Sequence, residues 1–229
     1  MLSRAEDTEL ETESKNVSRP GLLFVVSSPS GGGKGTLIKR LLDVAPDLSY
    51  SVSYTTRVPR NGEQNDREYH FVDRQLFEQM ISAGAFLEWA CVHGNYYGTA
   101  KKQVADETTA GIDLVLEVDV QGAASVRGLR LDAVSIFIVP PSFETLRQRL
   151  TARGTDTPEQ LAVRLRNAPA ELDQYRHFDY VIINDNLDRA ATQLAAIISA
   201  ERARCKRQEV RVEKIIEEFK QASINDKKE

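Results

Sequence analysis

The sequence has only two cysteines, Cys91 and Cys205, and they lie far apart along its 229 residues. This pair offers neither a disulfide framework nor the spacing of a metal site, so we expect two reduced thiols. The sequence also lacks an apolar run of membrane-spanning length and a signal-peptide core. Basic residues are not in excess, since the formal net charge is −4, and nucleic acid is disfavoured as a main partner. We therefore expect a cytoplasmic protein whose partners are neither membranes nor nucleic acids.

What the sequence does contain is a balanced globular composition, with 41% hydrophobic and 28% charged residues. Its length suits one good core with a small inserted lobe. Residues 1–20 are polar and acidic-leaning, and we expect them to form a disordered extension. The other expected parts are a core over 21–52 and 100–200 with a lid at about 150–165, an inserted lobe over 53–99, and a charged helical tail over 201–229.

Residues 24–37 have the order of a phosphate-binding loop: an apolar β-branched run, a glycine-rich turn and then an amphipathic segment. Glycines let backbone N–H groups surround an anion, and the N-terminus of the following helix adds partial positive charge. Lys34 then places an ammonium group near the outer phosphates. An ordinary turn between a strand and a helix is the alternative, but the lysine at this offset favours nucleotide binding.

The loop departs from the usual consensus at two positions. Ser28 replaces the first glycine, which is tolerable if its backbone keeps a negative φ. Gly35 stands where a metal-contacting hydroxyl is expected, and Thr36 follows one residue later. The second departure indicates that Mg²⁺ is held largely by water and by the nucleotide, which this ion accepts readily.

Strands and helices alternate along the chain, which predicts an α/β fold: a P-loop NTPase-type parallel sheet flanked by helices. The inserted α+β lobe is expected to close with a turn at Gly94–Thr99. Pro169 is expected to kink or divide its helix near Asn167. The expected strands are 22–27, one that begins at Ser51, 112–119, 133–139 and 180–185, with short segments at 69–72 and 86–93 in the lobe. The expected helices are 34–44, 73–83, 101–110, one capped by Ser142, 158–175 and one from 187.

The last of these helices carries an apolar stripe that can extend through Phe219 amid dense charge. We expect it to pack on the body of the protein or on a partner subunit. A homo-oligomer is therefore a hypothesis to test.

Further motifs follow the glycine loop in a fixed order. They are Ser51-Val52-Ser53-x-Thr55-Thr56-Arg57-x-Pro59-Arg60-x-Gly62-Glu63, Glu88-Trp89, Gly94-Asn95-Tyr96-Tyr97-Gly98, Glu117-Val118-Asp119-Val120-Gln121-Gly122, Arg153-Gly154-Thr155 and Asn184-Asp185. Together they resemble the guanylate kinases, over about Leu22 to Ile198. A glycine loop alone indicates a superfamily, whereas this ordered set is specific to one family. The resemblance implies that ATP, with Mg²⁺, donates its γ-phosphoryl group to GMP and also to dGMP, in the recycling of GMP within purine metabolism.

The resemblance assigns the acceptor phosphate to a pair of arginines. Arg57 and Arg60 flank a proline turn that fixes two guanidinium groups close together, and planar donor forks suit a phosphate dianion. A solvated arginine pair is the alternative, which the rigid turn and the nearby tyrosines disfavour. By resemblance, the GMP phosphate site comprises Arg57, Arg60, Tyr69 and Tyr97, with Ser53 and Glu63 in support.

Guanine presents N1–H and an exocyclic amino group, and carboxylates are the natural acceptors for these donors. Glu88 and Asp119 fit this role, while the hydroxyl of Thr99 can donate to O6. Glu88 could instead be a surface acid, but its place between two large apolar residues favours a pocket wall. Asp119 could also assist Mg²⁺ through water, and no residue is assigned as a certain metal ligand.

Phosphoryl transfer depends on positioning and on neutralising charge. The resemblance gives Lys34, Arg57 and the lid arginines Arg149, Arg153 and Arg164 catalytic roles. It gives the ATP site to Ser28, Pro29, Ser30, Gly31, Gly32, Gly33, Lys34, Gly35, Thr36 and Asn184. For Asn184, which would contact the ATP base, an ordinary strand-end turn residue is an equal alternative.

The sequence disfavours three other functions. A non-catalytic guanylate-kinase-like binding module typically loses the loop lysine and the phosphate-binding arginines, which are present here. A regulatory GTPase needs an Asn-Lys-x-Asp guanine motif, which the sequence lacks. A kinase for another nucleoside monophosphate, such as AMP, is countered by the residues that suit guanine.

Overall fold

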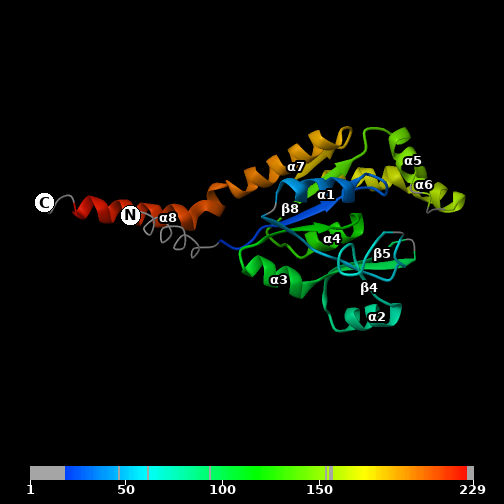
Figure 1. Cartoon of the computed structure of the whole chain (residues 1–229), viewed down its shortest axis with the longest axis horizontal. Helices are drawn as coiled ribbons and strands as arrows, with labels where there is room; N and C mark the ends of the chain where they lie inside the picture. The colour runs from blue at the N-terminus through cyan, green and yellow to red at the C-terminus, as the bar shows by residue number, and fades with distance from the viewer. Residues whose placement is uncertain are drawn as a thin grey trace, which may run out of the picture.

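A computed structural model of the chain describes residues 19–45, 47–60, 62–92, 94–152, 154 and 157–225. Its centre is a parallel sheet of five strands in the order β2-β7-β1-β8-β9 (Figure 1). The strands are β1 (Leu23–Ser27), β2 (Leu48–Tyr50), β7 (Asp113–Glu117), β8 (Ala133–Val139) and β9 (Tyr180–Ile183). All five residues of β1 are buried, as expected for a strand covered on both faces. The predicted α/β class is confirmed.

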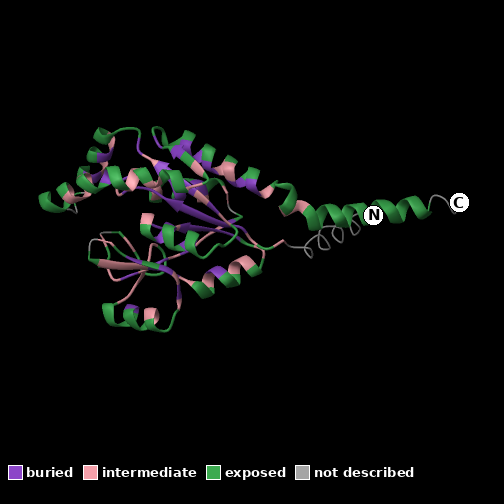
Figure 2. Cartoon of the chain, turned by 180° about the vertical axis from the view of Figure 1, so that it is seen from behind, coloured by how far each residue is buried: buried purple, intermediate pink, exposed green. Residues whose placement is uncertain are grey.

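Helices cover both faces of this sheet (Figure 2). On one face, α1 (Lys34–Val44) and α7 (Leu187–Arg202) pack Leu37, Leu41 and Leu194 against Phe24 and Val26 of β1. On the other face, α3 (Lys101–Thr109) and α4 (Val120–Gly128) pack against the alternate side chains of β1 and β7. The two cores hold the carboxyl ends of β1 and β7 side by side, where the glycine loop begins.

The inserted lobe contains a four-stranded sheet in the order β4-β3-β6-β5. Its elements are β3 (Tyr54–Thr55), β4 (His70–Phe71), α2 (Arg74–Ser82), β5 (Phe86–Val92) and β6 (Asn95–Ala100). The predicted turn at Gly94–Thr99 is wrong, because residues 95–100 form β6, which pairs antiparallel with β5. Gly98 serves close packing in this strand, since a Cβ there would lie 3.0 Å from the ring of Phe77. Only Gly94, at φ +82, belongs to the turn itself.

The region after β8 forms α5 (Phe143–Ala152), α6 (Pro158–Asp173) and the 3₁₀ helix η2 (Gln174–His177). The predicted cap is confirmed, since Thr145 N–H donates to Ser142 Oγ at 3.1 Å. α6 runs unbroken through Pro169, so the predicted division near Asn167 is wrong. A proline removes only one helical hydrogen bond, and Ala168 is held in a small core with Leu146 and Leu150 of α5.

The C-terminal segment is two helices, because α7 ends at Arg202 and α8 (Cys205–Asn225) begins after a short break. Figures 1 and 2 show α8 projecting away from the rest of the protein, with residues 209–225 exposed all round. The predicted packing on the body therefore holds for α7 and is wrong for residues 209–225 of α8, for which packing on a partner subunit stays a prediction. Within the described part of the chain, no helix combines the length and the apolar character needed to cross a membrane.

Candidate active site

The glycine loop joins the end of β1 to the start of α1 and forms one wall of a cavity of about 200 Å³. Gly31 and Gly33 have φ of +84 and +89, which side-chain-bearing residues rarely adopt. A Cβ on Gly33 would lie 2.6 Å from Asn184 Nδ2, so this position has no space for a side chain either. Among the described non-glycine residues, only Asp66 and Arg130 have a positive φ, so Ser28 keeps the negative φ that was predicted.

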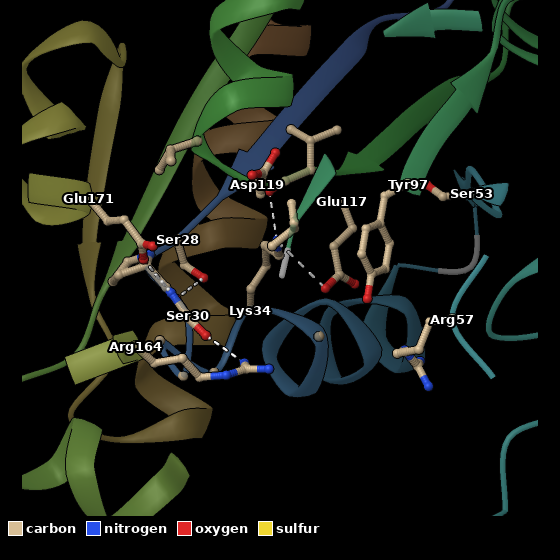
Figure 3. A pocket seen from close by; sticks show the side chains of 18 of the residues that line it. Ser28, Ser30, Lys34, Ser53, Arg57, Tyr97, Glu117, Asp119, Arg164 and Glu171 are labelled. Carbon is tan, nitrogen blue, oxygen red and sulfur yellow. Dashed lines mark hydrogen bonds and ion pairs between the residues drawn. The ribbon is translucent and has the colours of Figure 1, made fainter. Parts of the chain in front are cut away.

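Lys34 is the first residue of α1 and extends into the cavity towards the end of β7 (Figure 3). Its Nζ donates to the carbonyl of Val118 at 2.6 Å and lies 3.8 Å from Glu117 Oε1. The other carboxylate oxygen of Glu117 accepts from Tyr50 Oη at 3.2 Å. The sequence interpretation expected functional acids at the end of this buried parallel strand, but it did not name Glu117 among the site residues.

The helices of the expected lid, α5 and α6, contact the glycine loop. Arg164 of α6 donates to Ser30 Oγ at 2.9 Å, and Ser30 N–H donates to Glu171 Oε2 at 2.8 Å (Figure 3). Glu171 was missed by the sequence interpretation; its spacing of seven residues from Arg164, two helical turns, is the signal that could have found it. The predicted Arg153 lies outside the described residues.

Arg149 and Asn184 lie behind the loop instead of facing the cavity. Arg149 donates to the carbonyls of Gly32 at 3.1 Å and Asn184 at 2.8 Å. Asn184 is only 3% exposed, and its Nδ2 donates to the same Gly32 carbonyl at 3.2 Å. Both side chains therefore support the loop here, and Thr36 is exposed on α1 away from the cavity wall.

The inserted lobe supplies the facing wall of the same cavity, which Arg57, Arg60, Tyr69, Tyr97 and Ser53 line. Arg57 and Glu63 form a bidentate ion pair at 2.9 and 3.0 Å, and Glu63 also accepts from Arg60 N–H at 2.7 Å. Burial raises the pKa of Glu63, but the hydrogen bond and charge of Arg57 outweigh it and hold this pKa below its ordinary value. Glu63 thus lies behind Arg57 and fixes its guanidinium group.

Tyr69 and Tyr97 pack edge to face beside this pair, with ring centroids 5.9 Å apart. The guanidinium carbon of Arg57 lies 5.4 Å from the Tyr69 ring centroid, within cation–π range. Burial and the nearby charge of Glu117 raise the pKa of Tyr69, so its hydroxyl keeps its proton and can donate. This wall therefore presents several hydrogen-bond donors to the cavity.

Between the two walls lies a pair of carboxylates. Glu88 is 6% exposed and accepts from Thr99 Oγ1 at 2.6 Å. Burial raises the pKa of Glu88 to about 7, and the charge of Asp119 adds to this, while the Thr99 hydrogen bond opposes it. Asp119 caps α4 by accepting from Gly122 N–H at 2.8 Å. Thr99 is buried and directs its hydroxyl at Glu88, so here it orients that carboxylate.

The cavity thus joins a backbone anion site and a lysine on one side to arginine and tyrosine donors on the other, with a buried acid between them (Figure 3). Such a site can hold two phosphate-bearing ligands against each other. The described residues contain no cluster of three or more His, Cys, Asp or Glu side chains that could hold a metal ion. Glu117 and Asp119 nevertheless offer carboxylate oxygens on the cavity wall, which is the ligand type that Mg²⁺ prefers.

Comparison with known proteins gives the family of this chain. The family model described as guanylate kinase matches residues 21–201. A guanylate kinase of Dechloromonas aromatica is 54% identical over 180 residues, covering 79% of this chain and 89% of that protein. One of Psychrobacter arcticus is 50% identical over 196 residues, covering 86% and 94% respectively. The crystal structure of guanylate kinase from Anaplasma phagocytophilum superimposes with a TM-score of 0.70 at 35% identity, covering 83% of this chain and 93% of that one. The chain belongs to the guanylate kinase family.

Proposed function

We propose that this protein transfers the γ-phosphoryl group of ATP to GMP, and also to dGMP, giving ADP and the nucleoside diphosphate. The observation that carries the proposal is the single cavity lined both by the glycine loop and by Arg57, Arg60 and Tyr97. Two phosphate sites that face each other bring the reacting groups into line, which supplies much of the catalysis in phosphoryl transfer. The reaction recycles GMP in purine nucleotide metabolism. Cytoplasm is the proposed compartment, because both thiols are free and exposed.

The donor site is formed by residues 28–36, which include Lys34. The backbone N–H groups of the loop surround the ATP phosphates, and the ammonium group of Lys34 follows the moving γ-phosphoryl group. Lys34 is already fixed by the Val118 carbonyl and lies near Glu117, so little reorganisation is needed. Mg²⁺ bound with ATP neutralises phosphate charge; Glu117 and Asp119 would hold it through water.

The acceptor site is formed by the lobe over 53–99. The forked guanidinium groups of Arg57 and Arg60 bind the GMP phosphate, with hydroxyl donors from Tyr69, Tyr97 and Ser53. Glu63 orients Arg57 through the bidentate pair, which uses one N–H of each terminal guanidinium nitrogen. Arg57 and Arg60 bring positive charge to this wall of the cavity, which favours the binding of a phosphate dianion.

Glu88 reads the guanine base. In its ionised form it accepts from N1–H and from the amino group, while Thr99 holds it in place and Asp119 supports the same edge. Adenine offers an acceptor and a C–H at this edge, which leaves the buried carboxylate unpaired. Each lost partner costs about 1–3 kcal/mol, so AMP is rejected.

The lid at about 150–165 completes the site when both nucleotides are bound. Arg164 already contacts Ser30, and Arg149 lies one layer behind the loop. Closure turns these arginines, with Arg153, towards the transferring group and excludes water, which suppresses hydrolysis of ATP. Asn184, which donates to the Gly32 carbonyl, is the proposed contact of the ATP base. Self-association of the chain belongs to the same proposal and rests on the exposed side of α8.

A coupled assay of ADP formation with GMP, dGMP, AMP, UMP and CMP tests this function. Turnover with GMP and dGMP far above the other three supports it. Equal turnover with AMP would assign the site to another base. The absence of ADP with every acceptor, while GMP still binds, would identify a non-catalytic binding module.

A further inference from the structure

We infer that Gly122 of α4 is a positioning residue for base recognition, because the side chain that it lacks leaves the space into which the Glu88 carboxylate fits. The inference rests on the proposed function, in which Glu88 accepts from guanine. Helix α4 belongs to the core and Glu88 to strand β5 of the inserted lobe, and these two elements pack against each other (Figure 1). At Gly122 the helix comes close enough to touch the Glu88 carboxylate.

Three neighbouring atoms define the space at Gly122. A Cβ built on Gly122 would lie 2.5 Å from Glu88 Oε2, 3.1 Å from Val118 Cβ and 3.3 Å from Asp119 Oδ1. The first of these distances is far below the separation at which two non-bonded heavy atoms attract each other. A methyl group at position 122 would therefore collide with the Glu88 carboxylate as it stands, and it would also crowd Asp119, the second carboxylate of the proposed base site.

Neither the backbone conformation nor the helix cap accounts for a glycine at this position. Gly122 is not among the glycines with a positive φ, so alanine could adopt the same backbone conformation. The Gly122 N–H donates to Asp119 Oδ1 at 2.8 Å and so completes the cap of α4, but the N–H of any residue other than proline could do this. Glycine is also less favourable than alanine inside a helix. What alanine would take away here is the space for the carboxylate.

The Glu88 carboxylate is the group that would move if this space were filled. Val118 is packed in the core and α4 is fixed by its cap, whereas the carboxylate ends a side chain with rotatable bonds. Glu88 Oε1 accepts from Thr99 Oγ1 at 2.6 Å, so a methyl group at position 122 would force the carboxylate off this bond or further into the cavity. Either movement takes its oxygens away from the guanine edge, while the fold and the glycine loop keep their positions.

Gly122→Ala tests the inference against Gly128→Ala, a matched control at the end of the same helix. A Cβ on Gly128 would meet no heavy atom of the described residues within 4 Å beyond its own stretch of helix. Steady-state kinetics should show the KM for GMP raised about tenfold or more in Gly122→Ala, with kcat and the KM for ATP unchanged. The kcat/KM for AMP should not fall, because adenine does not pair with the carboxylate. Gly128→Ala should match the wild type. Equal losses for GMP and ATP, or equal behaviour of the two variants, would overturn the inference.

Shortening the acid gives a readout that a purely structural role of Gly122 would not move. Glu88→Asp draws the carboxylate back by one methylene group, which leaves room for a methyl group at position 122. Gly122→Ala should therefore raise the KM for GMP only about twofold or less when Glu88→Asp is already present, a coupling that distant and independent sites do not show. Effects that simply add in this double-mutant cycle would overturn the inference.

The same variants separate this inference from the proposed function. If the wild type does not prefer GMP to AMP, the proposed function fails and the inference fails with it. If the wild type prefers GMP and Glu88→Asp weakens this preference, but Gly122→Ala uses GMP as Gly128→Ala does, only the inference fails. Thermal unfolding checks that Gly122→Ala is folded, as we expect when the carboxylate moves and the helix does not. A chain that fails to fold both with and without Glu88→Asp would also overturn the inference.

Discussion

Replacing Glu88 by glutamine separates recognition of the base from every other part of the site. The carboxylate is 6% exposed and held by Thr99, and glutamine keeps both its shape and an oxygen that can accept from that hydroxyl. The change removes the negative charge and turns one acceptor towards guanine into a donor. A hydrogen bond to a charged group contributes about 1.5–3 kcal/mol, which corresponds to roughly a 10- to 100-fold weaker affinity for GMP. The affinity for ATP should stay unchanged.

The pH dependence of the same variant gives a second, independent reading. Since burial raises the pKa of Glu88 to about 7, the carboxyl group must release a proton before it accepts from guanine below that pH. The GMP affinity of the wild type should therefore fall by up to about tenfold per pH unit below pH 7, and Glu88→Gln should lack this component. The ratio of the two affinities cancels the titration of the GMP phosphate itself, near pH 6.

The free energy of unfolding should change with pH in the direction opposite to the affinity for GMP. The folded chain binds more protons at Glu88 than the unfolded chain between its ordinary pKa and about 7, so the free energy of unfolding falls as pH rises through this window. Glu88→Gln should remove that fall and be the more stable protein at pH 8, as measured by urea denaturation. Calorimetry of GMP and ATP binding from pH 5.5 to 8 completes the experiment. If both ligands weaken equally, or if the pH dependence persists in the variant, Glu88 does not read the base.

Three further changes test the other walls of the cavity and its support. Lys34→Ala should lower kcat by about 100-fold or more while GMP affinity stays unchanged, because the ammonium group acts on the transferring phosphate, and steady-state kinetics with fluorescence binding would check this. Glu171→Ala should lower the KM for ATP severalfold, since it frees Ser30 N–H and removes a negative charge from the loop; a raised KM would contradict the reasoning. Asp113→Asn should destabilise the fold by about 3 kcal/mol in urea denaturation at pH 7, because this 3% exposed carboxylate pairs with Arg19 and Arg202. The difference in the free energy of unfolding between the two proteins should shrink as pH falls towards the lowered pKa of Asp113, because the wild type then loses the same charge.

The parts of the fold that the sequence predicts are those where local signals agree. Strand β8 has the predicted bounds because its apolar run ends at Pro140-Pro141, and α1 has them because it starts after the glycine loop. Strand β6 was mistaken for a turn because Gly94 and Gly98 look alike in sequence, yet only Gly94 has a positive φ. Helix α4 and the short β2 were not predicted. The N-terminal cap of α4 is Asp119, which the sequence interpretation assigned to the recognition of guanine instead.

For the site, the sequence predicts residues that act through their own type and motif, such as Lys34 and Arg57. It does not predict residues whose contacts depend on how distant elements meet. Glu171 reaches Ser30 across 141 positions only because α6 folds back over the loop. Thr99 is assigned to guanine by the resemblance, but its pairing with Glu88 follows from the β5–β6 register, in which these two residues are opposite each other.

Side chains of α5 and α6 hold the glycine loop through contacts that nucleotide binding would change. Glu171 occupies the Ser30 N–H that a phosphate oxygen would take, and Arg149 donates to two backbone carbonyls instead of to an anion. In the proposed function, ATP must therefore displace the Glu171 carboxylate from Ser30 N–H, whereas the bond from Arg164 to Ser30 Oγ is a separate contact. Both residues lie on α6, which also packs on α5 through Ala168, Leu146 and Leu150. We therefore expect the binding of ATP to be coupled to the position of α6 through the hydrogen bond from Ser30 N–H to Glu171.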